Sequence, residues 1–389
     1  MDRRTLISAV AVGTLAGAGA GIAAARVAGA GATTAAAGGI AGPAIASGAV
    51  RLNMVTSWPK GMLGLGMSAE RVVEKARELS GGTLDIRLYA AGELVGAFEV
   101  FDAVATGSAD IYHSAEYYWG GKHAAYPFFT AVPFGMTAME QLGWLDHGGG
   151  QALWEELSAG FGVVPLAVTN TCHQAGGWFK REINSLADFR GLKMRIPGIG
   201  GEMVRRLGGA AVAIPGGEIY QSLQSGVIDA AEFVGPWNDL GLGFYREAPF
   251  YYAPGLHEPG AILAMGINKA RFERLSPEHQ RVLRAVARDV YLTSIGEFTY
   301  QNGVALEKLR RDHNITLRPF PEDVVREAAR VSQEMWAEAG STDALGRRIY
   351  ESWLTAFRAM RPWMEGAESL YASVRSGALG AADAMRGAP

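Results

Sequence analysis

The chain has 389 residues, of which 49% are apolar and 19% charged, and its formal net charge at pH 7 is −3. The apolar fraction allows a buried core, which excludes wholesale disorder, and the length predicts two or three domains at roughly 150 residues each. The slightly acidic charge provides no basic field for phosphate contacts and argues against nucleic acid as a partner. The single cysteine, Cys172, excludes an internal disulfide framework and thiolate metal sites.

Residues 1–49 consist mostly of Ala and Gly and differ in composition from the rest of the chain. Arg3 and Arg4 precede a weakly apolar run at 9–12, which is the order of an export signal. The adjacent arginines resemble a twin-arginine signal, and an ordinary secretory signal is the alternative. Gly-rich Ala segments make poor membrane-spanning helices, so we expect export rather than anchoring. The mature chain is then expected to begin between residues 25 and 50.

The hydrophobic pattern predicts alternating strands and helices in the first part of the chain. Strands are expected at 51–56, 83–89 and 109–113, with helices at 64–79 and 98–105 between them. This β-α-β-α-β order is typical of a mostly parallel sheet.

Further along, strands and helices continue to alternate before the chain becomes mainly helical. A Pro-, Gly- and aromatic-rich stretch at 236–259 is interpreted as ordered loop, and Ser276 followed by Pro277 predicts the start of a long helix reaching Arg311. The other predicted elements are strands at 161–168, 178–180, 192–196, 227–233 and 315–319, and helices at 201–207, 218–224, 322–339 and 344–374.

Three separated segments resemble one known family. They read LADFRGLKMRIP at 186–197, EIYQSLQSGVIDAAE at 218–232 and FDAVATGSADI at 101–111. Together they closely resemble the solute-binding subunit of TRAP transporters, and the resemblance spans about residues 50–340 in the right order. SWPK at 57–60 and VGPWND at 234–239, together with Tyr117-Tyr118-Trp119, resemble the branch that binds 2-oxo acids.

The resemblance implies an α/β fold of the periplasmic-binding-protein type. Two α/β domains would surround a ligand cleft, with crossing strands at the hinge and long helices at the C-terminus. The expected parts are an export signal and Ala/Gly-rich leader at 1–49, domain I at 50–165 and 232–265, domain II at 166–231 and 266–340, a C-terminal helix at 341–375 and a flexible tail at 376–389.

The function implied by the resemblance is binding, not catalysis. The chain would capture a small carboxylate in the periplasm, a 2-oxo acid such as pyruvate, and deliver it to a small and a large membrane subunit. Lactate or a bulkier acid, an exported enzyme, and a ligand-sensing partner of a membrane receptor are the alternatives. The lack of cysteine ligands, of a GxGxxG motif and of a base–nucleophile pair argues against an exported oxidoreductase.

Arg195 is the candidate for binding the ligand carboxylate. It ends the predicted strand at 192–196, and a guanidinium holds a carboxylate through two parallel hydrogen bonds that Lys does not reproduce. From the residues alone, a surface salt bridge is an equal interpretation. The resemblance assigns the carboxylate-binding role to Arg195.

Glu232 is the candidate metal ligand, since a lone carboxylate at the end of an apolar strand is costly to bury without a partner. The resemblance implies that Glu232, the backbone carbonyl of Phe233 and the side chain of Gln174 hold an ion that also touches the ligand. Such oxygen donors suit Na⁺ or Ca²⁺. The formal charges of Arg195, Glu232, the ion and a ligand anion sum to zero if the ion is Na⁺, so Na⁺ is expected and Ca²⁺ is the alternative. No organic cofactor is expected. The branch usually carries Trp where Phe233 stands, which affects the pocket wall.

Aromatic residues are expected to line the pocket, although core packing is the alternative for each of them. The candidates are Trp58, Tyr118 and Trp237, together with Tyr117. Trp58 and Tyr118 come just after predicted strands, where cleft residues collect in open α/β sheets.

Three residues of kinds that often bind metals lie close together in the sequence: His113, Glu116 and His123. Their spacing does not match a pair of histidines on one face of a helix. Because their segment is predicted as strand and loop, we expect ordinary structural roles for them.

The predicted helix at 344–374 carries an apolar stripe. The stripe lies beyond the part needed for two α/β domains, and in the 2-oxo-acid branch this helix is swapped between two subunits. A homodimer is therefore expected, and a helix folded back on its own subunit is the alternative. The stripe consists of Leu345, Ile349, Trp353, Phe357, Met360, Met364 and Leu370.

Overall fold

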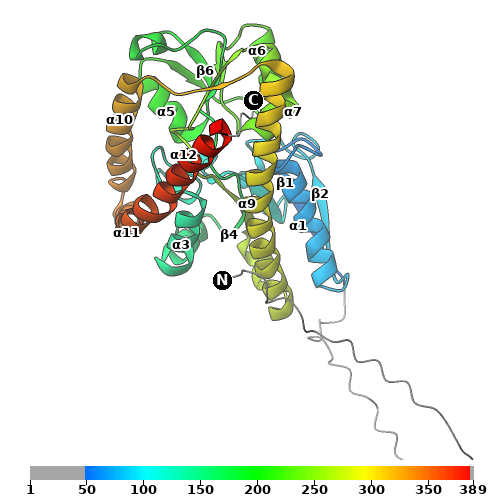
Figure 1. Ribbon diagram of the computed structural model, residues 1–389. Helices are drawn as coiled ribbons and strands as arrows, with labels where there is room; N and C mark the ends of the chain where they lie inside the picture. Colours follow the sequence, from blue (N-terminus) through cyan, green and yellow to red (C-terminus); the bar gives the residue numbers. More distant parts are fainter. Residues whose placement is uncertain (1–48, 386–389) are drawn as a thin grey trace, which may run out of the picture. The chain divides into compact units, whose positions relative to one another are not determined.

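The computed structural model describes residues 49–385, with side chains described up to residue 380. These residues form two β-sheets with helices packed against them (Figure 1). The predicted export signal lies outside the described residues. Among the helices from residue 49 onward, none is long and apolar enough to span a bilayer.

The first sheet has five strands, and its three N-terminal strands are parallel, as the β-α-β-α-β order predicts. The two remaining strands join it in antiparallel register. In sheet order the strands are β2 (Leu84–Tyr89), β1 (Val50–Thr56), β3 (Ile111–Ser114), β10 (Ile262–Asn268) and β4 (Val163–Asn170). Its helices are α1 (Leu65–Leu79), α2 (Val100–Ala105), α3 (Ala138–His147), α4 (Gly150–Ala159) and α8 (Lys269–Glu273).

The second sheet has six short strands. The chain enters it through 171–176, returns to the first sheet through 253–261, and reaches the second sheet again through the helical segment 269–316, so three segments connect the sheets. In sheet order the strands are β11 (Leu317–Arg318), β9 (Phe250–Tyr252), β5 (Gly177–Phe179), β8 (Ala230–Ala231), β6 (Lys193–Arg195) and β7 (Ala210–Val212). Its helices include α5 (Gly198–Arg206), α6 (Ile219–Gln224) and α7 (Pro236–Leu242).

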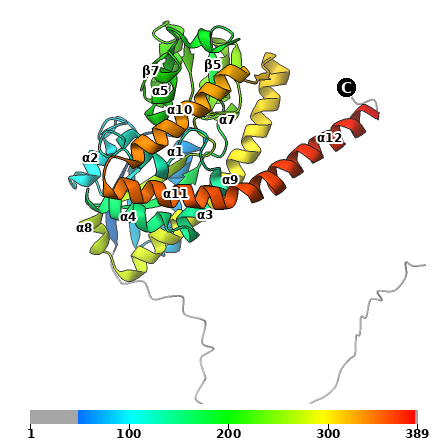
Figure 2. The ribbon, with the colours of Figure 1, turned by 90° about the vertical axis from the view of Figure 1, so that its left-hand side faces the viewer.

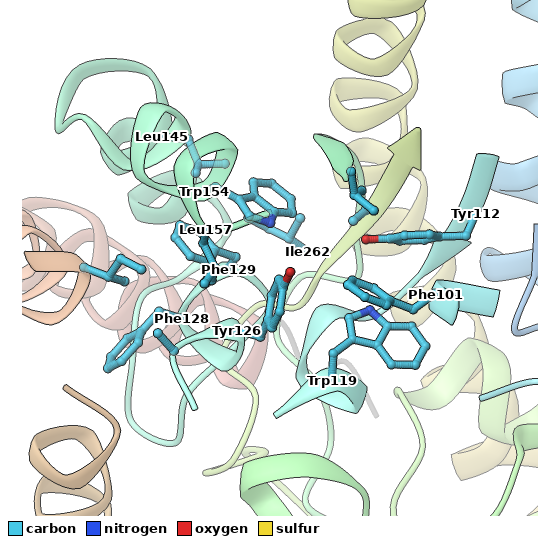
Figure 3. Close-up of a cluster of buried hydrophobic side chains, with 14 of the residues drawn as sticks. Phe101, Tyr112, Trp119, Tyr126, Phe128, Phe129, Leu145, Trp154, Leu157 and Ile262 are labelled. Carbon is cyan, nitrogen blue, oxygen red and sulfur yellow. The ribbon is translucent and has the colours of Figure 1, made fainter. Parts of the chain in front are cut away.

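A cluster of aromatic side chains fills one face of the first sheet (Figure 3). Phe129 stacks on Trp144 and on Trp154, with ring centroids 5.2 and 5.3 Å apart. Phe101 packs against Trp119 at 5.2 Å. This core therefore fixes the short 3-10 helix η1 (Glu116–Trp119), which follows β3 and carries the candidate Tyr118.

One long helix, α9 (Pro277–His313), packs on the cores of both sheets (Figure 1). It begins as predicted, with the Ser276 side chain accepting a hydrogen bond from the His279 amide and proline in the first turn. Val290 belongs to the core of the first sheet, whereas Phe298 belongs to the cluster built on the second.

The stretch at 236–259 is not only loop, which corrects the interpretation from composition. Pro236 occupies the first turn of α7, and Gly243, with φ 76°, ends it. Proline in the first turn and glycine at the C-cap are typical of the two ends of a helix, so these residues bound a helix here and do not prevent one. Tyr251 of β9 is buried because its ring stacks on Trp178 at 3.9 Å. The expected strand at 227–233 is reduced to β8, and α3 and α4 are additional to the predicted elements.

The C-terminal part is nearly continuous helix (Figure 2). The apolar stripe predicted there divides in two. Ile349 and Trp353 are buried in the chain's own aromatic core, with Phe357 and Met360 packed beside them, so this half needs no partner. Beyond it, Trp363, Leu370, Tyr371, Val374 and Leu379 are exposed. The elements are α10 (Glu322–Gly340), α11 (Ala344–Trp363), a π-helical turn η6 (Met364–Ser369) and α12 (Leu370–Met385).

Candidate functional site

Arg195 and Glu232 lie side by side in the interior. Arg195 ends β6, which pairs in parallel with β8, and Glu232 is the residue directly after β8. Adjacent parallel strands bring their carboxyl ends together, so both side chains reach the same place. The Nη1 atom of Arg195 lies 3.5 Å from Oε2 of Glu232, and both side chains are 1% exposed.

Arg195 is held mainly by backbone carbonyls. Nε donates to the oxygen of Ile214 at 3.0 Å, and Nη1 donates to the backbone oxygen of Glu232 at 2.6 Å. A guanidinium has more donors than these two contacts use, so the side chain is oriented and still able to bind an anion. A surface salt bridge is thereby excluded for Arg195.

Two further titratable residues, His257 and Glu258, complete the cluster and were missed by the sequence reasoning. They lie in the crossing segment 253–261, with 2% and 3% exposure. Nε2 of His257 is 3.2 Å from Oε1 of Glu232 and 4.0 Å from Oε1 of Glu258. Burial, reinforced by the negative charge of Glu232, raises the pKa of Glu258. A charged pair in an otherwise apolar segment was the signal that could have found them.

Gln174 reaches the same place from the other crossing segment. Its backbone N–H donates to the backbone oxygen of Glu258 at 3.2 Å, and its backbone carbonyl accepts a hydrogen bond from the N–H of Gly255 at 2.8 Å. The side-chain Nε2 donates to Thr171, which directs Oε1 away from that contact. The crossing segments 171–176 and 253–261 are thus joined at the candidate site.

Several buried oxygens of this cluster have no hydrogen-bond partner among residues 49–380. They are both carboxylate oxygens of Glu232, Oε1 of Gln174 and Oε2 of Glu258. One ligating atom from each of Glu232, His257 and Glu258 lies within 4.8 Å of the others. A buried unpaired polar group costs about 1–3 kcal/mol. Two of these three ligating atoms are carboxylate oxygens and the third is a nitrogen of His257. The carboxylate oxygens, together with Oε1 of Gln174, are donors that suit a hard cation such as Na⁺ or Ca²⁺.

The predicted wall residues share one hydrophobic cluster, together with Tyr117. Trp58, Tyr118 and Tyr117 pack closely, with centroids 6.4 Å apart for Trp58 and Tyr118 and 4.9 Å for the two tyrosines. Burial raises the pKa of Tyr118 to about 12, and the nearby charge of Arg195 acts in the opposite direction. Trp237 instead packs against Phe298 of α9 at 5.3 Å.

A cavity of about 590 Å³ adjoins this cluster. It is lined on one side by Phe98, Tyr117 and Tyr118 and on the other by Pro197 and Ile199. The first three residues come from the region of the first sheet and the other two from that of the second, so the cavity lies between the two regions. Pro197 comes two residues after Arg195, which does not itself line the cavity.

The three potential metal ligands in and after β3, which are His113, Glu116 and His123, make structural contacts, as expected. His113 accepts a hydrogen bond from Nε1 of Trp58 at 2.8 Å, and its other ring nitrogen lies 3.2 Å from Oγ1 of Thr169. Glu116 accepts from the Tyr112 hydroxyl at 2.7 Å, and His123 pairs with Asp343 at 3.0 Å. Each residue is accounted for by a different contact.

A fold of two sheets joined by crossing segments, with a buried arginine and carboxylate oxygens lacking hydrogen-bond partners at the crossing, is typical of a protein that binds a small solute between two α/β lobes. Residues 60–343 match bacterial extracellular solute-binding protein family 7, and the chain belongs to this family. Its members are extracytoplasmic binding proteins of transporters and not enzymes, in agreement with the sequence prediction.

Individual relatives within this family are similar to the chain over most of its length. The chain is 40% identical over 327 residues to the monocarboxylate 2-oxoacid-binding periplasmic protein of Nostoc sp. strain PCC 7120, which covers 84% of this chain and 89% of that protein. A TRAP transporter solute-binding protein from Bordetella bronchiseptica RB50, a dimer with copurified calcium and picolinate, is 33% identical with a TM-score of 0.84, covering 86% and 99% of the two chains. One from Pseudoalteromonas atlantica T6c with bound sodium and pyruvate is 35% identical with a TM-score of 0.80, covering 84% and 99%.

Proposed function

We propose that this chain captures a small 2-oxo acid such as pyruvate in the periplasm and delivers it to the small and large membrane subunits of a TRAP transporter. The observation that carries the proposal is the buried convergence of Arg195 with the unpartnered oxygens of Glu232, Gln174 and Glu258. A cation and an organic anion together would satisfy both groups.

Arg195 would hold the ligand carboxylate. Its contacts with Ile214 and Glu232 fix the plane of the guanidinium before the ligand arrives, and its remaining donors can form two parallel bonds. Preorganisation of this kind lowers the entropy lost on binding. Trp58, Tyr118 and Phe233 would form the wall around the carbon skeleton, with Trp237 supporting them from α9.

A cation would be held by the side chains of Glu232 and Gln174 and the backbone carbonyl of Phe233, as the family resemblance implies, with Glu258 as an additional donor. The ion would neutralise the carboxylates and attract the ligand anion. With Glu258 ionised and His257 neutral, Arg195 (+1), Glu232 (−1), Glu258 (−1) and a monocarboxylate (−1) sum to −2, which Ca²⁺ balances. Although burial opposes it, the carboxylates of Glu232 and Glu258 raise the pKa of His257, and a protonated His257 (+1) changes the sum to −1, which Na⁺ balances. With one of the two carboxyls protonated the sum is −1, which Na⁺ balances. The count that favoured Na⁺ omitted Glu258 and His257.

The hinge would lie at the crossing segments 171–176 and 253–261, between two α/β domains. A ligand that touches both sides favours the closed state by its difference in affinity for the two states. Small-angle scattering should therefore report a smaller radius of gyration with saturating pyruvate than without it.

The chain would act as a homodimer, with α12 and its exposed apolar residues covered by a second copy. The leader at 1–49 would direct export, by a twin-arginine or an ordinary signal.

Isothermal titration of the purified mature protein with pyruvate, lactate and longer 2-oxo acids tests the proposal. Binding of at least one 2-oxo acid with dependence on Na⁺ or Ca²⁺ is expected, and mass spectrometry of acid released from denatured protein identifies the natural ligand. Tightest binding of lactate or a bulkier acid would change the substrate. If none of these carboxylates binds, the proposed ligand class is refuted.

A further inference from the structure

Gly216 lies where any side chain would collide with Phe233. It begins the 3-10 helix η4 (Gly216–Glu218) and is buried. A Cβ at this position would stand 2.6 Å from both Cε2 and Cζ of Phe233 and 3.3 Å from Cε of Met62. The φ angle of Gly216 lies outside the left-handed region, so alanine is compatible with the backbone. The position therefore depends on the absence of a side chain and not on conformational freedom.

The ring that occupies this space lies beside the anion-binding group. The ring centroid of Phe233 is 5.3 Å from Cζ of Arg195, a distance at which a guanidinium and an aromatic face attract each other. The segment that carries Gly216 also contacts Arg195 directly, because Ile214 accepts the hydrogen bond from Nε. One short segment thus supplies the carbonyl that orients Arg195 and the space for the ring beside it.

The same turn meets the first sheet's side of the cleft. Met62 and Pro59 follow β1, whereas η4 follows β7 of the second sheet. A Cβ at Gly217 would lie 3.1 Å from Cγ of Pro59, and the Cβ at Gly216 would press on Met62 as well. The two glycines therefore allow the two sides to approach closely next to the candidate site.

We propose that Gly216 is a positioning residue that sets the size of the ligand by acting through Phe233. This inference rests on the proposed function. Without a side chain at 216, the ring stays against the turn and beside Arg195, where it limits the length of the acid that Arg195 can hold. A methyl group at 216 displaces the ring from Arg195, whereas a shorter side chain at 233 makes room for a longer acid.

The test is a double-mutant cycle with Gly216→Ala, Phe233→Leu and the double variant, titrated with pyruvate and with a five-carbon 2-oxo acid. Leu lacks the two ring atoms that meet the Cβ, and the backbone carbonyl at 233 is retained. Gly296→Ala is the control, because a Cβ at Gly296 meets nothing within 4 Å and its φ is likewise ordinary.

Gly216→Ala is expected to weaken pyruvate binding by at least about tenfold, while Gly296→Ala leaves it unchanged. Phe233→Leu should raise the affinity for the longer acid relative to pyruvate. In the double variant, pyruvate affinity should return to within about threefold of Phe233→Leu alone, since the effects of residues in contact are not additive.

Additive losses in the double variant would overturn the pairing, as would wild-type affinity in Gly216→Ala. If Gly216→Ala does not fold, a double variant that folds and binds supports the inference, and one that also fails to fold overturns it. Wild-type protein that binds no 2-oxo acid refutes the proposed function, and the positioning role falls with it. Wild-type binding with an unaffected Gly216→Ala variant refutes the positioning role alone.

Discussion

The guanidinium of Arg195 is hydrogen-bonded to the backbone of Glu232 and not to its carboxylate. The distance from Nη1 is 2.6 Å to the backbone oxygen and 3.5 Å to Oε2. The two oppositely charged residues are therefore hydrogen-bonded through the main chain, and in the described part of the chain the carboxylate oxygens of Glu232 have no hydrogen-bond partner, only ion-pair contacts with Arg195 and His257. This division of contacts leads to separate predictions for the two residues.

Arg195→Lys is expected to lower the affinity for pyruvate at least tenfold, or about 1.4 kcal/mol. The single nitrogen of Lys does not bond Ile214, Glu232 and a carboxylate in one plane. Titration calorimetry measures the change, with Arg205→Lys as the control because Arg205 is half exposed on α5. Unchanged affinity in Arg195→Lys would show that the ligand is anchored elsewhere.

Glu232→Gln is expected to weaken binding of both the cation and the ligand. The substitution keeps the size and one oxygen donor but removes the negative charge that attracts the ion. If the ion touches the ligand, each raises the other's affinity by the same factor. Titrations of chelated, Na⁺-free protein with and without added Na⁺ or Ca²⁺ measure this coupling, and Glu334→Gln on the exposed face of α10 is the control. Ligand affinity that is independent of both ions would remove the cation from recognition.

Removal of the chain after Trp363 is expected to convert a dimer into a monomer. The cut deletes η6 and α12, where Leu370, Tyr371 and Val374 are exposed, but retains Ile349 and Trp353 in the core. The truncated protein should therefore stay folded, which circular dichroism checks. Light scattering gives the mass, and a truncated protein that is still dimeric would place the interface elsewhere.

His113 is expected to make the protein less stable in acid. Burial lowers its pKa to about 3, so between about pH 6.5 and pH 3 the unfolded chain binds a proton that the folded chain does not. Stability then falls as the pH decreases through this window, by about 2 kcal/mol at pH 5 at roughly 1.4 kcal/mol per pH unit. The variant His113→Gln keeps a hydrogen-bond acceptor for Trp58, and its free energy of unfolding should not show this dependence on pH. Urea unfolding at pH 5 and pH 7.5 compares the two proteins, and equal pH dependence would contradict the assignment.

The sequence predicted the parts of the fold that local patterns control. The parallel β-α-β-α-β opening and the start of α9 follow from periodicity and capping residues, and the structure confirms them. It also brings Arg195 and Glu232 together, because Arg195 ends β6 and Glu232 directly follows the neighbouring parallel strand β8. What covers an apolar helix face is not a local property. The stripe from Leu345 to Leu370 was therefore correct as a pattern, although its first half is covered by the chain itself.

His257 and Glu258 were missed for a similar reason. They lie in the stretch 236–259, which is rich in Pro, Gly and aromatic residues, so its composition favoured an ordered loop. Their position depends on the backbone contacts that join 253–261 to Gln174, some 80 residues earlier, and pairing at such separation leaves no periodic signal.

The helix α9 also has a consequence for how the protein denatures. Its Leu283 and Val290 complete the core of the first sheet, and Phe298 and Leu309 complete the cluster on the second. Neither half can lose its structure without exposing residues of a helix that the other half needs. Heating should therefore produce one cooperative transition, with the calorimetric enthalpy equal to the van't Hoff enthalpy, even though the chain contains two separate sheets.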